Sequence, residues 1–212
     1  MILDKEFAKE LAQNLLEINA VVLRPDDPFT WSSGWKSPIY CDNRLTLRHP
    51  ELRNKIADKF TEIFDEINDV DVITATATAG IPHAAWIAQK CDKPMAYVRS
   101  KAKSYGMGNQ IEGGVEKNES TVVIEDLIST GSSAISVVEV LEFIGANINA
   151  VFSIFTYGFD KSNKKFEEKN VPLYTLTDYN TLIEVAIKTE FVEPEHLQLL
   201  SSWRENPEEW PK

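Results

Sequence analysis

The chain has 212 residues, of which 43% are hydrophobic and 26% are charged, and its formal net charge is −11. These values are ordinary for a soluble globular protein and exclude a fibre, a disordered chain and a disulfide-stapled miniprotein. The acidic balance argues against general nucleic-acid binding, because contacts to phosphates need surplus lysine and arginine.

We expect no membrane-spanning or secretory segment in this sequence. It contains no run of about 18 apolar residues, and its first ten residues are charged helix formers where a secretory signal would be apolar. Cys41 and Cys91 lie far apart, and the three histidines are scattered, so we expect reduced thiols and no histidine-based metal site. We therefore expect one cytoplasmic domain spanning residues 1–212.

The hydrophobic pattern predicts strands that alternate with helices. Apolar residues at helical spacing predict helices at 5–18 and 50–66, with loops and short strands over 24–44. The expected order then continues with a strand at 70–75, a helix near 83–91, a strand at 94–98 and a polar glycine-bearing stretch at 99–119. A strand at 121–126 and a helix at 132–144 that ends at Gly145 follow. The last expected elements are strands at 149–155 and near 171–176 and helices near 178–187 and 194–203. This alternation predicts an α/β fold with a mostly parallel central sheet flanked by helices. Ligands of such folds lie beyond the carboxyl ends of the strands, which directs attention to the loops that follow 70–75, 94–98 and 121–126.

The strongest motif joins the strand at 121–126 to the next helix. The strand ends in Glu125 and Asp126, and a turn with Gly131 and three hydroxyl residues, Thr130, Ser132 and Ser133, opens the helix. Unpaired N–H groups at a helix start bind anions, and phosphate suits that geometry. The two carboxylates repel phosphate but accept hydrogen bonds from the vicinal hydroxyls of a sugar. The motif therefore predicts a sugar-phosphate site, and the alternative is a capped helix with an aspartate turn.

A basic stretch follows the strand at 94–98. Residues 93–111 contain no aspartate or glutamate but four cations: Lys93, Arg99, Lys101 and Lys103. A mobile basic loop over an anion site would close on a diphosphate, exclude water and stabilise the charge on a departing group. The alternative is an exposed polar hairpin.

Small residues fill the turn at 76–80, after the strand at 70–75. Small side chains expose backbone N–H groups and let a diphosphate approach the backbone. A tight strand-to-helix turn without a ligand is the alternative.

These motifs resemble the phosphoribosyl pyrophosphate (PRPP) motif of the type I phosphoribosyltransferases. Nearly the whole chain resembles the orotate phosphoribosyltransferase family through four further blocks, at 29–44, 75–85, 97–103 and 108–113. The first block holds a Ser-Gly-Trp-Lys-Ser-Pro sequence, and other members of the superfamily lack this kind of block. The resemblance implies the type I phosphoribosyltransferase fold, with a small base-binding hood formed by about residues 1–45 and the C-terminal segment.

The resemblance also implies an activity and its partners. The implied reaction transfers the phosphoribosyl group from PRPP to orotate, giving orotidine 5′-monophosphate and pyrophosphate in the synthesis of UMP. Mg²⁺ is the implied cofactor, bound mainly through PRPP and with Asp126 as a ligand through water. The implied assembly is a homodimer in which the basic loop 99–112 serves the partner subunit's site.

Residue roles follow from the same resemblance. Arg99, Lys103 and Asp126 are implied to be catalytic, and Tyr40, Cys41 and Ser129 are implied to bind orotate. The implied PRPP contacts are Thr78, Ala79, Arg99, Lys101, Lys103, Tyr105, Glu125, Asp126, Leu127, Ile128, Ser129, Thr130, Gly131, Ser132 and Ser133. The chain departs from the family pattern at Ser32, Ser100, Tyr105 and Tyr157, where many or some relatives carry a cation or a histidine.

Two other functions remain open on the sequence. One is a superfamily enzyme acting on a purine or on uracil, against which the Ser-Gly-Trp-Lys-Ser-Pro block argues. The other is a non-enzymatic regulator that senses PRPP or a nucleotide, against which the retained Arg99 and Lys103 argue. Trp203 and Trp210 suggest no function, and a packed C-terminal cap is expected there.

Overall fold

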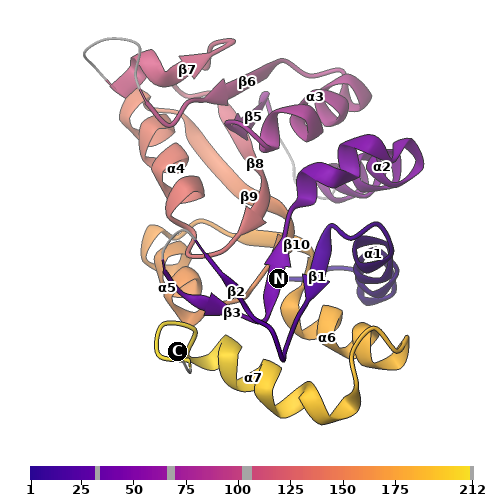
Figure 1. Cartoon of the computed structure of the whole chain (residues 1–212). Coiled ribbons are helices and arrows are strands. Elements are labelled where there is room, and N and C mark those ends of the chain that lie inside the picture. Colours follow the sequence, from indigo (N-terminus) through magenta and orange to yellow (C-terminus); the bar gives the residue numbers. More distant parts are fainter. Residues whose placement is uncertain (32–33, 66–69, 102–106, 211–212) are drawn as a thin grey trace.

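A six-stranded sheet forms the centre of the molecule in a computed structural model, which describes residues 1–31, 34–65, 70–101 and 107–210 (Figure 1). The strands follow the order β10-β9-β8-β5-β6-β7. Their bounds are β5 (Val72–Thr76), β6 (Met95–Val98), β7 (Ile111–Glu112), β8 (Ser120–Ile128), β9 (Asn147–Thr156) and β10 (Leu173–Asp178). Every neighbouring pair is parallel except β6 and β7, which are antiparallel. The mostly parallel sheet predicted from the sequence is thus confirmed.

Helices cover both faces of this sheet, and each face has its own hydrophobic core. The larger core joins the sheet to α1 (Lys5–Glu17), α2 (Pro50–Asp65), α3 (Gly80–Cys91) and α6 (Tyr179–Lys188). The smaller core joins it to α4 (Ser132–Ile144) and α5 (Asp160–Lys169). Alternate residues of β8 serve the two cores, because successive side chains of a strand point to opposite faces: Val122 and Ile124 enter the larger core and Val123 the smaller.

A pair of small hairpins lies beside the sheet. Strand β1 (Val21–Leu23) pairs with β4 (Ile39–Cys41), and β2 (Phe29–Thr30) pairs with β3 (Lys36–Ser37). The 3₁₀ helix η1 (Asn43–Arg48) follows β4. The C-terminal helix α7 (Leu197–Glu205), which follows the 3₁₀ helix η3 (Pro194–His196), packs against the hairpins. The fully buried Trp203 donates its indole N–H to the Lys36 carbonyl at 3.0 Å and contacts Trp31 edge-on. The expected packed C-terminal cap is confirmed.

The predicted helices and strands are present in the structure, although several bounds shift by two or three residues, and the short strand β7 inside the stretch at 99–119 was not predicted. Helix α3 begins at Gly80, three residues before the predicted start. Helix α5 was not predicted, and its sequence gives a reason, because only Ser162 and Phe166 of its ten residues are buried. So short an apolar stripe leaves no clear helical periodicity. None of the helices in the described ranges is long and apolar enough to cross a membrane.

Candidate active site

The loops after β5, β6 and β8 meet at the carboxyl edge of the sheet, because these strands are neighbours in it. A cavity of about 230 Å³ shows how they meet: Thr76 and Ala77 line it from the first loop, Arg99 from the second, and Ser132 and Ser133 from the third. Sequence positions more than 50 residues apart are thereby gathered at one place, as the predicted topology requires.

The turn before α4 is built to leave backbone donors open. Gly131 stands at the N-cap of α4 with φ of +74°, and no described side chain caps the first turn of the helix. A Cβ at this position would lie 3.1 Å from Ser162 Oγ and 3.2 Å from Phe166 Cε2. Glycine is therefore favoured here for two reasons: it adopts the left-handed backbone conformation without strain, and it has no Cβ to clash with α5. Ser132 and Ser133 are exposed beside the open N–H groups, an arrangement that suits an anion.

Two carboxylates stand immediately before that turn. Glu125 is 5% exposed, its Oε1 accepts the Asp126 backbone N–H at 3.1 Å, and Asp126 is partly buried. Burial and the charge of Asp126 raise the pKa of Glu125 well above its ordinary value, and burial also raises the pKa of Asp126. These groups lack solvation, so hydroxyl hydrogens or a cation brought by a ligand would stabilise their charged forms. The remaining predicted residues continue from them, since Leu127 and Ile128 end β8 and Ser129 and Thr130 form the turn.

In the turn after β5, the backbone lies at the carboxyl edge of the sheet. Gly80 packs so tightly on β8 that a Cβ there would lie 2.4 Å from the Ile124 carbonyl oxygen. Ala79 is the N-cap of α3 without a side-chain cap, the exposed Thr78 precedes it, and the Ala77–Thr78 peptide bond is cis. The start of α3 offers fewer open N–H donors than that of α4, because Ile81 donates its N–H to the Thr78 carbonyl at 3.3 Å and Pro82 has no N–H.

The basic stretch begins and ends on paired strands. Arg99 donates its backbone N–H to the Gln110 carbonyl at 2.9 Å, and the Gln110 side chain donates to the Arg99 carbonyl at 2.8 Å. The Arg99 guanidinium lies 3.6 Å from Glu112 Oε1, and Lys101 is exposed. The structure thus places Arg99 in one cavity with the turns before α3 and α4, whereas Lys103 and Tyr105 lie outside the described residues.

An aromatic cavity of about 590 Å³ lies between the hairpins and the turn before α4. Its lining residues are Phe29, Thr30, Trp31, Trp35, Tyr40, Cys41, Leu127, Ser129, Thr130 and Tyr157. The three predicted base-binding residues, Tyr40, Cys41 and Ser129, thus share one cavity with Thr130. The described part of its wall contains no lysine or arginine. Burial raises the pKa of Tyr157 well above its ordinary value, so its phenol is neutral.

Comparisons with known proteins agree with this geometry. The phosphoribosyl transferase domain family matches residues 45–190. The orotate phosphoribosyltransferase of Listeria innocua is 55% identical over 205 residues, which cover 96% of this chain and 98% of that protein. The chain belongs to the orotate phosphoribosyltransferase family. The enzyme of that name from Bacillus pumilus is 52% identical over 95% of this chain and 96% of its own length.

Structural comparison supports the same family. The crystal structure of orotate phosphoribosyltransferase from Aeropyrum pernix superposes with a TM-score of 0.74 at 27% identity, covering 86% of this chain and 99% of that one. The predicted type I phosphoribosyltransferase fold is confirmed, and so is the family resemblance drawn from the motifs.

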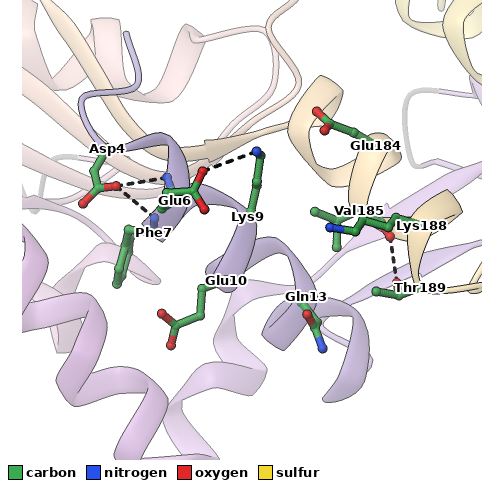
Figure 2. A pocket seen from close by; sticks show the side chains of 10 residues that line it. All are labelled: Asp4, Glu6, Phe7, Lys9, Glu10, Gln13, Glu184, Val185, Lys188 and Thr189. Atoms are coloured by element: carbon green, nitrogen blue, oxygen red, sulfur yellow. Dashed lines mark hydrogen bonds and ion pairs between the residues drawn. The ribbon is translucent and has the colours of Figure 1, made fainter.

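A second large hollow, of about 540 Å³, lies between α1 and α6, and none of its lining residues comes from the loops just described. Figure 2 shows three of its charged side chains in local interactions: Asp4 caps α1, and Lys9 pairs with Glu6. None of the site residues predicted from the motifs and described by the structure lines this hollow.

Two residues near the site were not found by sequence reasoning. Asn43 of η1 donates its side-chain N–H to the Asp126 carbonyl at 2.7 Å and so holds the end of β8. It lies inside the block at 29–44, which was the available signal. Lys165 of α5 donates to the Thr130 carbonyl at 2.9 Å and to Ser132 Oγ at 2.6 Å. No sequence motif pointed to Lys165, since the helix that carries it was not predicted.

Proposed function

We propose that this chain transfers the phosphoribosyl group of PRPP to orotate, giving orotidine 5′-monophosphate and pyrophosphate on the route to UMP. Family membership over nearly the whole chain supports the activity. The single structural observation that carries it is the meeting of two strand-to-helix turns, a carboxylate pair and an aromatic cavity at one sheet edge.

Each part of PRPP has a matching part of the site in this proposal. The turn at 129–133 holds the 5′-phosphate, and Glu125 and Asp126 accept hydrogen bonds from the ribose hydroxyls, with Leu127 and Ile128 joining the two. The diphosphate meets the backbone at Thr78 and Ala79. The cations Arg99, Lys101 and Lys103, with the phenol of Tyr105, surround it from the basic loop 99–112.

Orotate occupies the aromatic cavity, against Tyr40, Cys41 and Ser129. A planar base needs a flat apolar face and donors at its edge, and Phe29, Trp31 and nearby backbone groups supply both. The hairpins of about residues 1–45 and the C-terminal segment together form the hood over the base. The contact of Trp203 with Lys36 and Trp31 supports this division.

The proposed reaction needs no covalent intermediate on the protein. The bond from ribose C1 to the diphosphate oxygen breaks, its electron pair leaves with the diphosphate, and C1 gains oxocarbenium character. Orotate N1 then bonds to C1, and the N1 proton passes to the departing diphosphate. Positioning and electrostatic stabilisation are the chain's contributions: Asp126 faces the developing positive charge, while Arg99 and Lys103 stabilise the leaving group.

The carboxylate pair fits a Mg²⁺ ion that arrives with the substrate. Among the described residues no three histidine, cysteine, aspartate or glutamate side chains gather as a protein-built metal site. Mg²⁺ keeps several waters and uses few protein ligands beside substrate phosphates, so Asp126 suffices as a contact through water. When bound, the ion neutralises the diphosphate. We also propose a homodimer with the loop 99–112 shared between subunits, and a cytoplasmic location.

The absorbance of orotate tests the proposal directly. Orotate should disappear only when PRPP and Mg²⁺ are both present, and omission of either should abolish the loss. Hypoxanthine, adenine and uracil, offered as competing acceptors, should leave the rate unchanged. A folded chain that consumes one of those bases and not orotate would contradict the assignment of the base.

A further inference from the structure

The side chain of Lys165 ties helix α5 to the turn that precedes α4. Its ammonium donates one hydrogen bond to the Thr130 carbonyl at 2.9 Å and another to Ser132 Oγ at 2.6 Å. Both acceptors belong to the turn assigned to the 5′-phosphate. The contact joins residues 33 and 35 positions apart, so it arises from the tertiary packing.

The surroundings of Lys165 differ from those of two other lysines on the same helix. Lys161 pairs with Glu208, and Lys169 pairs with Glu139 and Glu142. Lys165 pairs with no carboxylate within the described ranges, and its third ammonium hydrogen has no hydrogen-bond acceptor there. An uncompensated positive charge thus stands at the anion-binding turn of a chain whose net charge is −11.

The contact with Ser132 also sets the role of a hydroxyl oxygen. An ammonium group has no acceptor, so Ser132 Oγ must accept from Lys165. Ser132 Oγ also lies 3.2 Å from Thr130 Oγ1, and when Thr130 is the donor of that pair the Ser132 hydrogen is available to an anion. Ser132 opens α4 beside its uncapped N–H groups. An anion bonded to that hydroxyl lies roughly 5 Å from the ammonium nitrogen, given ordinary hydrogen-bond lengths.

Helix α5 is held in place for this contact by packing on the turn itself. The space beside Gly131 is filled by Ser162 and Phe166, which lie one turn before and one residue after Lys165. Gly131 lets α5 come close enough for the lysine to reach the carbonyl behind the turn.

We propose that Lys165 is a positioning residue for the 5′-phosphate of PRPP. It holds the Thr130 carbonyl and the Ser132 hydroxyl in the binding arrangement and adds a positive charge to the field at the turn. The inference rests on the proposed function, because it concerns the phosphate end of that substrate. Since the 5′-phosphate does not react, Lys165 acts on binding more than on turnover.

Three substitutions separate charge from hydrogen bonding. Lys165→Arg keeps both, Lys165→Gln keeps a donor but loses the charge, and Lys165→Met loses both. We expect Lys165→Gln to raise the KM for PRPP about tenfold, with kcat and the KM for orotate nearly unchanged. Lys165→Met should raise the KM further, and Lys165→Arg should restore most of the affinity. Lys164→Gln, an exposed neighbour on the same helix, is the matched control and should behave as wild type.

Direct binding supplies a readout independent of turnover. Calorimetry with ribose 5-phosphate should show weaker binding by Lys165→Gln and a shallower dependence on salt concentration, because one cation near the phosphate is lost. If the chain binds ribose 5-phosphate through Lys165 but consumes no orotate, the proposed function fails and this inference stands. Equal PRPP and ribose 5-phosphate affinities in Lys165→Gln and Lys164→Gln overturn it. A Lys165→Met protein with a lower Tm and lower kcat at unchanged KM for PRPP also overturns it, since that pattern describes a structural contact only.

Discussion

Glu125 and Asp126 occupy positions where their charges are poorly solvated. Their raised pKa values mean that the folded chain favours the neutral carboxyl groups, so at neutral pH the ionised forms reduce stability. A substrate with several hydroxyls, or a cation held beside them, would relieve this cost. Active-site groups often oppose stability in this way.

Replacing Asp126 by asparagine should therefore affect activity and stability in opposite directions. We expect Asp126→Asn to lower kcat on the order of 100-fold, because the ribose loses an orienting acceptor. The free energy of unfolding in urea should stay equal or rise, since the variant removes a charge that burial disfavours. Parallel losses of turnover and of unfolding free energy would instead indicate a structural role.

At the scale of elements, η1 and α3 meet around a fully buried histidine. His83 lies in the first turns of α3, its Nε2 is 3.5 Å from Thr46 Oγ1 of η1, and its ring contacts Trp86 edge-on. Burial lowers the pKa of His83 to about 4. The imidazole is therefore neutral at pH 7 and acts as part of the packing between these elements.

The contribution of His83 to the stability of the chain should consequently fall in mild acid, opposite in sign to the contributions of Glu125 and Asp126. An unfolded histidine takes up its proton below a pH of about 6.5, whereas folded His83 does so only near 4, so the unfolded state binds more protons between these values. The lost free energy of unfolding has an upper bound of about 3 kcal/mol. Urea unfolding from pH 7 to pH 4 should show a smaller decline for His83→Gln than for wild type. His49→Gln serves as the control, and an identical decline in all three proteins would refute this explanation.

How far the sequence predicts the molecule depends on whether a feature is local. The strands, the helix that follows Gly131 and the loops at the sheet edge could be predicted, because periodicity and glycine placement are local properties. The Lys165 contact, the Asn43 bond to Asp126 and the Trp203 bond to Lys36 could not, because each joins residues 33 to 167 positions apart. Tertiary packing decides which residues form these contacts, and no regular spacing in the sequence indicates them.

At the scale of the whole molecule, the proposed dimer places Lys103 and Asp126 of one active site on different chains. Lys103→Ala and Asp126→Asn proteins should each be nearly inactive alone. When mixed and allowed to exchange subunits, each heterodimer should contain one intact site, so activity should return. If heterodimers form, as shown by differently tagged subunits, and activity stays absent, the shared-site arrangement is wrong.

The hydrogen bond from Trp203 to Lys36 has a consequence for synthesis on the ribosome. A nascent chain that has reached β10 already carries every strand of the central sheet and the turn at 129–133. It still lacks the indole that secures the β2–β3 hairpin and supports Trp31. The aromatic cavity proposed for the acceptor base is thus the last part of the site to be completed, well after the turns proposed to bind the sugar and its phosphate.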